Sequence, residues 1–182
     1  MNGYDPNDVG QNNGNIFSLP HQYDESSIIL IPVPWDVTTS YRDGTSNGPQ
    51  AILEASGQLD FYHKSGAKIW EFGVHLLPIE EEIIAKNKSF RAIAKQHIEA
   101  LENGNFKADC NVDLERVSVI NNACHELKNH VKSKALKLID DTKLVGLIGG
   151  DHGCALGIIE ALSERHKSFG ILQIDAHADL RE

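Results

Sequence analysis

The sequence has little cysteine and no cysteine pair. Its three cysteines, Cys110, Cys124 and Cys154, are widely separated among 182 residues. Without a pair at ligand spacing, a zinc site built from thiolates is excluded, and a disulfide framework is not expected. We interpret Cys154 as a small buried packing residue. Unpaired cysteines fit a reducing compartment, so we expect a cytoplasmic protein.

Basic residues are also scarce. Lys and Arg number 17 against 26 Asp and Glu, which gives a formal net charge of −9 at pH 7. Nucleic-acid recognition requires a basic face, so no nucleic-acid partner is expected, whereas a small cationic substrate is compatible with the acidic balance. The sequence shows neither an apolar run of membrane-spanning length nor a signal segment. We therefore expect no membrane partner.

Short apolar runs alternate with segments of helical period, which predicts one α/β domain. The runs are β-branched or leucine-rich, as buried parallel strands are. The expected strands cover residues 27–31, 68–75, 144–148 and 169–172, and the expected helices begin at 48–49 and cover 79–101, 112–137 and 155–166. Residues 1–25, rich in Asn, Gly and Asp at their start, are expected to form a loose N-terminal arm, and residues 26–182 the domain.

Two carboxylates and an imidazole follow the expected strand 169–172. In Asp175-Ala176-His177-Ala178-Asp179 the polar residues alternate with alanine. Residues two apart point to the same side of an extended backbone. Asp175, His177 and Asp179 are therefore predicted to converge on one point.

A second polar cluster, Gly149-Gly150-Asp151-His152, follows the expected strand 144–148. The helix 155–166 has the length of a crossover that brings the two strands into parallel register, and ligands collect beyond the carboxyl ends of such strands. Imidazole with carboxylate suits a divalent transition metal, and this much oxygen favours manganese over zinc. The alternative is that these side chains only cap helices or bond loops. That is the expected role for one such residue and a weaker explanation for the whole cluster.

These two clusters resemble the N-terminal metal signatures of the ureohydrolases, the arginase, agmatinase and formimidoylglutamase family. The resemblance implies a three-layer α/β/α fold with a mainly parallel sheet, as in arginases and deacetylases, and a centre of two Mn2+ ions. Position by position, it assigns these metal ligands: His152 on the first ion, His177 on the second, Asp175 bridging both, and Asp179 on the first.

The resemblance is partial. Asp151 is expected either to orient His152 or to bond the backbone of its turn, and Gly153 stands where the family usually has Ser, which is not a ligand position. The family's third signature, Ser-x-Asp-x-Asp-x-x-Asp-Pro, supplies two more aspartate ligands and does not occur in this sequence. We therefore expect the catalytic residues beyond Glu182, and a chain that is incomplete at its C-terminus and inactive alone.

The segment from Val33-Pro34-Trp35-Asp36 through Gly48-Pro49-Gln50-Ala51-Ile52 is similar to the N-terminal region of agmatinase-like ureohydrolases. The implied function is manganese-dependent hydrolysis of a linear guanidino or amidino compound, such as agmatine, arginine or N-formimidoylglutamate. The products would be urea or formamide plus an amine. The family also implies a homo-oligomer for the complete protein.

Two other functions remain open: another dinuclear metallohydrolase, because ligands do not name the electrophile, and a non-catalytic partner module or pseudoenzyme with the same fold. Two further patterns are interpreted as structural. The glutamates 80–82 point in different directions on a helix and suit its positive N-terminal end. His125 and His130 are five residues apart, whereas the zinc-peptidase helix motif requires a spacing of four.

Overall fold

A parallel sheet holds the centre of the computed structural model, which describes residues 4–11, 13–107 and 110–177. Within these residues the sheet has three strands in the order β2-β1-β3. The middle strand β1 (Ile28–Val33) pairs with β2 (Val74–Leu76) on one side and β3 (Leu144–Gly149) on the other. The register of β1 with β3 runs from Ile28↔Leu144 to Val33↔Gly149. The carboxyl ends of β1 and β3 therefore lie side by side.

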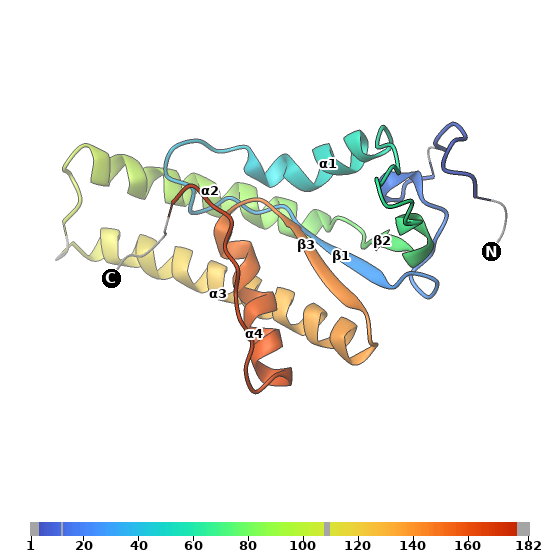
Figure 1. Ribbon diagram of the computed structural model, residues 1–182. Coiled ribbons are helices and arrows are strands. Elements are labelled where there is room, and N and C mark those ends of the chain that lie inside the picture. Colours follow the sequence, from blue (N-terminus) through green and yellow to red (C-terminus); the bar gives the residue numbers. More distant parts are fainter. Residues whose placement is uncertain (1–3, 12, 108–109, 178–182) are drawn as a thin grey trace.

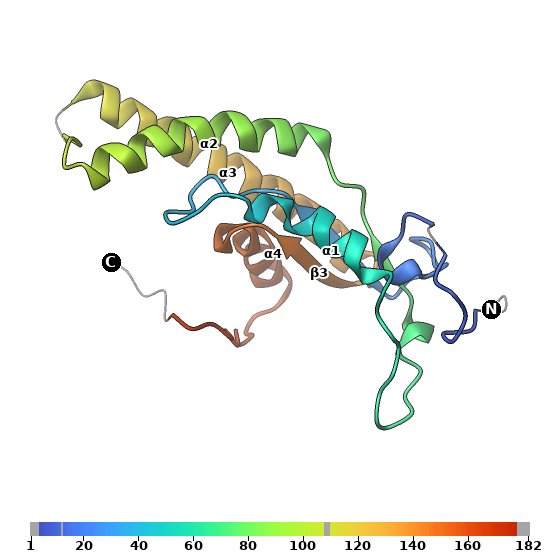
Figure 2. The same ribbon diagram turned by 90° about the horizontal axis from the view of Figure 1, so that it is seen from above.

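Helices cover both sides of this sheet. Helix α1 (Gly48–Ser56) lies on one side, and α3 (Asn111–Asp140) and α4 (Leu156–Arg165) lie on the other (Figure 1). Helix α2 (Glu81–Glu102) runs beside α3 (Figure 2). The α/β/α layering and the parallel strands confirm the predicted fold class.

The core lies between β1 and α3. Ile29, Ile31 and Val33 of β1 are at most 1% exposed, because alternate residues of a strand point to one face. Helix α3 contributes a stripe at helical spacing: Ile120, Ala123, Leu127, Val131, Ala135 and Leu138. Helix α4 packs closely on α3, since a Cβ at Gly157 would come within 2.7 Å of the Lys128 carbonyl oxygen.

Two of the predicted strands differ from the structure. The segment 68–75 forms a 3-10 turn, Ile69–Phe72, before the short β2. The segment 169–172 is not a strand, so that prediction is wrong. Within 166–177 no residue pairs with the sheet, and Ile171, Leu172 and Ile174 are 64%, 86% and 91% exposed. An apolar run forms a strand only where its backbone can pair with a neighbouring strand. This segment runs outside the helices and the sheet (Figure 2).

The N-terminal arm is shorter than expected. Ile16 and Leu19 are fully buried, and the Asn15 side chain donates to the Val74 carbonyl and accepts from the Leu76 N–H at 3.1 and 3.2 Å. The loose-arm prediction is therefore wrong for residues 15–19, because two apolar side chains of this stretch are buried and the Asn15 amide bonds the backbone of β2. None of the helices in the described part of the chain has the length and apolar character needed to cross a membrane.

Candidate metal centre

Hydrogen bonds join the end of β1 and the residues after it to the residues that follow β3. The Gly150 N–H donates to the Val33 carbonyl at 3.2 Å, and the Asp151 N–H donates to the Trp35 carbonyl at 2.8 Å. A Cβ at Gly150 would lie 1.9 Å from the Trp35 carbonyl oxygen, so only glycine fits. In a sheet of order β2-β1-β3, this β1/β3 edge is the topological switch point where ligands bind.

The Asp151 carboxylate bonds side chains next to this turn. Thr38 Oγ1 donates to Asp151 Oδ2 at 3.0 Å, and Cys154 Sγ lies 3.6 Å from Asp151 Oδ1. Cys154 is 2% exposed, and burial raises its pKa to about 12. A thiol in this state is a poor nucleophile and a poor ligand, which confirms its interpretation as a packing residue.

Three of the four predicted ligands come together. Asp175 lies between two imidazoles: its Oδ2 is 3.3 Å from His152 Nε2, and its Oδ1 is 3.3 Å from His177 Nδ1. The Asp175 side chain is 23% exposed, against 68% for His152 and 83% for His177. The fourth predicted ligand, Asp179, lies outside the described residues. Asp175 thus lies near both histidines although the segment that carries it is not a strand, and the role of these side chains as metal ligands stays a prediction.

Local contacts hold the Asp175 carboxylate in its ionised form. The backbone N–H of His177 donates to Asp175 Oδ1 at 2.7 Å. This bond, followed by the attraction of His152, lowers the pKa of Asp175 below its usual range. An ionised carboxylate beside two imidazoles offers donor atoms of the types that suit a divalent transition metal, so the chemistry of these residues is compatible with the manganese that the sequence predicts. As the described residues lie, no group of three or more His, Cys, Asp or Glu among them could hold a metal ion.

A buried carboxylate, Asp36, organises the loop of residues 34–47 beside this centre. It is 1% exposed, and its Oδ2 accepts from the N–H groups of Gly44 and Ser46 at 2.7 and 3.2 Å. Asn87 of α2 donates to Asp36 Oδ1 at 3.0 Å and accepts from the Asp36 N–H at 2.8 Å. Burial raises the pKa of Asp36, but these hydrogen bonds outweigh it and leave the pKa below its usual range.

Sequence reasoning did not single out Asp36 or Asn87. Each nevertheless carries a signal: Asp36 is flanked by the apolar residues Trp35 and Val37, and Asn87 lies on the stripe of α2 that includes Ile83 and is mostly apolar. A polar side chain on a buried stripe requires a partner. The two residues are 51 positions apart, so the sequence alone could not pair them.

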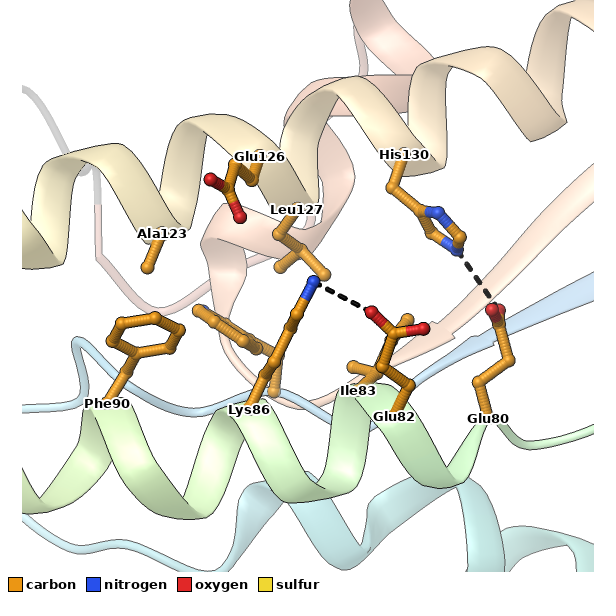
Figure 3. A pocket seen from close by; sticks show the side chains of 10 residues that line it. Glu80, Glu82, Ile83, Lys86, Phe90, Ala123, Glu126, Leu127 and His130 are labelled. Carbon is orange, nitrogen blue, oxygen red and sulfur yellow. Dashed lines mark hydrogen bonds and ion pairs between the residues drawn. The ribbon is translucent and has the colours of Figure 1, made fainter.

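The glutamates at the start of α2 do not form a second metal site. Glu80 pairs with Lys134. Its Oε1 also lies 3.1 Å from His130 Nε2, a contact that Figure 3 shows. Burial raises the pKa of Glu80, but its bonds to Lys134 and His130 outweigh burial and lower it. His125 instead lines the groove of about 430 Å³ beside Asp151, between α3 and the β3 turn. His125 and His130 thus diverge, as their spacing predicted.

The sequence of this chain is similar to sequences of known proteins. The arginase family model matches residues 26–182. An N(1)-aminopropylagmatine ureohydrolase from Synechocystis sp. is 25% identical over 88% of this chain and 42% of its own length. An agmatinase from Bacillus cereus is 27% identical over 93% of this chain and 46% of its own length. A proclavaminate amidinohydrolase from Streptomyces clavuligerus is 27% identical over 88% of this chain and 39% of its own length.

A solved structure shares the fold. The agmatine ureohydrolase of Thermoplasma volcanium matches with a TM-score of 0.54 and 21% identity, over 82% of this chain and 38% of that one. The chain therefore spans less than half the length of these relatives. The family match covers the sheet, its helices and both polar clusters, and the chain belongs to the arginase family.

Proposed function

We propose that this chain provides part of a manganese-dependent ureohydrolase centre. The observation that carries the proposal is the position of Asp175, 3.3 Å from both His152 and His177 at the β1/β3 edge. The relatives named for agmatine, aminopropylagmatine and proclavaminate hydrolysis support a guanidino compound as the substrate class. Agmatine is our first choice, and arginine and N-formimidoylglutamate are the others.

The proposed roles follow from the donor atoms. His152 and His177 would each supply one ring nitrogen to a metal, and Asp175 offers one oxygen toward each ring. The His177 N–H bond to Oδ1 fixes the carboxylate in this bridging orientation. Asp179 is proposed as a further ligand. When bound, the metal pair would lower the pKa of a coordinated water, which supplies the nucleophile that a poorly electrophilic guanidinium carbon requires.

The 182 residues alone are proposed to bind Mn2+ weakly and to turn over no substrate. They offer four candidate ligands, and the third family signature with its two aspartates does not occur in the sequence. Two ions would then share too few donors to be held firmly. We further propose that the whole protein is a cytoplasmic homo-oligomer that binds a small cationic or guanidino substrate and neither nucleic acid nor membrane.

The test is product identification. The uninterrupted reading frame that contains these residues is expressed, loaded with Mn2+, and given agmatine, arginine and N-formimidoylglutamate in parallel. Urea from agmatine is the expected result, and Asp175→Ala should abolish it while Asp60→Ala, an exposed carboxylate elsewhere, should not. Formamide would move the substrate to N-formimidoylglutamate. Stoichiometric metal binding without any of these products would overturn the substrate assignment and favour a non-catalytic module or another metallohydrolase.

A further inference from the structure

We propose that Thr38 is a positioning residue for the metal centre. Its hydroxyl would hold the turn that carries His152. The loop around Thr38 would itself be held by the buried Asp36–Asn87 pair and, separately, by the partly buried Arg91. This inference rests on the proposed function, because it assumes that His152 is a metal ligand.

The Asp36–Asn87 pair fixes the ends of the loop of residues 34–47. Asp36 binds Asn87 of α2 through two hydrogen bonds and closes the loop onto itself through the N–H groups of Gly44 and Ser46. Both Asp36 and Asn87 are buried, at 1% and 8% exposure. Buried and fully bonded polar groups favour one arrangement over its alternatives. The loop is therefore tied to the helical layer and not only to its own strand.

Arg91 then fixes the residues on either side of Thr38. Its Nη1 donates to the carbonyls of Val37 and Thr39 at 3.0 and 2.6 Å. A guanidinium group presents its donors in a rigid plane. With both neighbouring carbonyls held, the backbone of Thr38 has little freedom to turn, and its side chain stays directed at the β3 turn.

Thr38 finally contacts the residue that precedes His152. Its hydroxyl donates to Asp151 Oδ2 at 3.0 Å, while the Asp151 N–H donates to the Trp35 carbonyl at 2.8 Å. Asp151 is thus bound by two residues of the same loop, through its side chain and its backbone. Asp151 is also the N-cap of the short 3-10 turn that begins with His152. Any rotation of Asp151 would displace that imidazole.

The contact between Thr38 and Asp151 is exposed to solvent. Its loss should therefore change the position of Asp151 without changing the stability of the fold. Thr38 is exposed to solvent and is not part of the core. Removing its hydroxyl should therefore leave the urea midpoint of unfolding unchanged. Substituting a residue that hydrogen-bonds a metal ligand commonly lowers metal affinity by about 10- to 100-fold. Thr38 contacts Asp151, which precedes the ligand His152, so its substitution should lower the affinity by about three- to tenfold.

The test uses the protein encoded by the uninterrupted reading frame that contains these residues, called the uninterrupted protein, and three variants of it. Thr38→Val removes the hydroxyl at nearly constant shape, and Thr38→Ser restores it. Thr45→Val is the matched control, because Thr45 is an exposed threonine of the same loop that takes no part in these contacts. The Mn2+ dissociation constant is measured from the electron paramagnetic resonance signal of free Mn2+, and stability is measured by urea denaturation.

We expect Thr38→Val to raise the Mn2+ dissociation constant about three- to tenfold. Thr38→Ser and Thr45→Val should stay near the unaltered value, and all stabilities should be equal. Equal affinity in Thr38→Val, or an equal loss in Thr45→Val, would overturn the inference and leave the proposed function standing. If the unaltered protein bound no Mn2+, the proposed function would fail and the inference with it.

Discussion

The two polar segments of the candidate centre are held in different ways. The turn after β3 is bonded to the backbone of Val33 and Trp35, and Cys154 within it is 2% exposed. The segment that carries Asp175 and His177 is mostly exposed. It is held at this site by bonds within itself and by the contact of Asp175 Oδ2 with His152 Nε2 at 3.3 Å. The sheet therefore places the first histidine, and local contacts place the other two side chains.

This difference shows which part of the site depends on the fold. Packing and strand pairing determine where His152 lies, so changes in the core should move it. The position of Asp175 depends on charge and hydrogen bonds near solvent, so changes in its flanking apolar residues should alter the fold little. The predictions below compare the two segments through matched substitutions.

The largest effect on stability is expected from Ile31→Ala, compared with Ile171→Ala. Ile31 is 1% exposed in β1, and Ile171 is 64% exposed. Removing three buried carbons leaves a cavity and should cost about 3 to 4 kcal/mol, whereas the exposed substitution should stay within about 0.5 kcal/mol. Urea denaturation checks both values. A similar loss in both variants would mean that residues 169–172 pack as a strand after all.

A smaller but still large effect is expected from Gly150→Ala, compared with Gly170→Ala. The new Cβ would lie 1.9 Å from the Trp35 carbonyl oxygen at position 150, and it would meet nothing within 4 Å at position 170. The forced separation of the two strand ends should cost about 2 to 3 kcal/mol, and the control should be near neutral. Equal unfolding free energies for the two variants would contradict the close approach of the two chain segments.

The smallest loss of stability is expected from Asp36→Asn, in the loop that borders the β3 turn. An amide can accept fewer of the N–H bonds that reach Asp36, so the variant should lose about 1 to 3 kcal/mol at pH 7. Because the folded pKa of Asp36 is depressed, its stabilisation is complete above the unfolded-state value of about 3.9 and is lost as the pH falls through the folded value.

Denaturation from pH 7 down to acid should therefore show the gap between the unaltered protein and Asp36→Asn closing. Asp43→Asn, an exposed carboxyl of the same loop, is the control and should change little at any pH. A gap that stayed constant down to the acid limit would show that the loss comes from packing and not from the charge of Asp36.

Much of the fold could be predicted because its signals are local. The apolar run 27–31 and the run 144–148 became β1 and β3, and the helical periods became α1 to α4. The run 169–172 has the same local character, yet it is not a strand, because pairing depends on a neighbour that local sequence does not specify. The same limit hid the Asp36–Asn87 pair, whose members join across 51 residues.

For the site, alternation along the chain predicted that Asp175, His177 and Asp179 converge on one face of a strand, and their role as metal ligands stays a prediction. Asp175 and His177 do meet, but they meet through a turn in which the His177 N–H bonds Asp175, and not on one face of a strand. The Thr38–Asp151 contact links residues 113 positions apart. No spacing within either motif could have indicated it.

The central claim is that Asp175 joins His152 and His177 into one metal centre. It is tested most directly by titrating the uninterrupted protein and its Asp175→Ala variant with Mn2+ and measuring the free ion by electron paramagnetic resonance, with Asp60→Ala as the control. The account predicts a loss of affinity of at least about 100-fold in Asp175→Ala, at or above the upper end of what partners beyond the first ligands cause, and no change in the control. Equal affinity in all three proteins would contradict it.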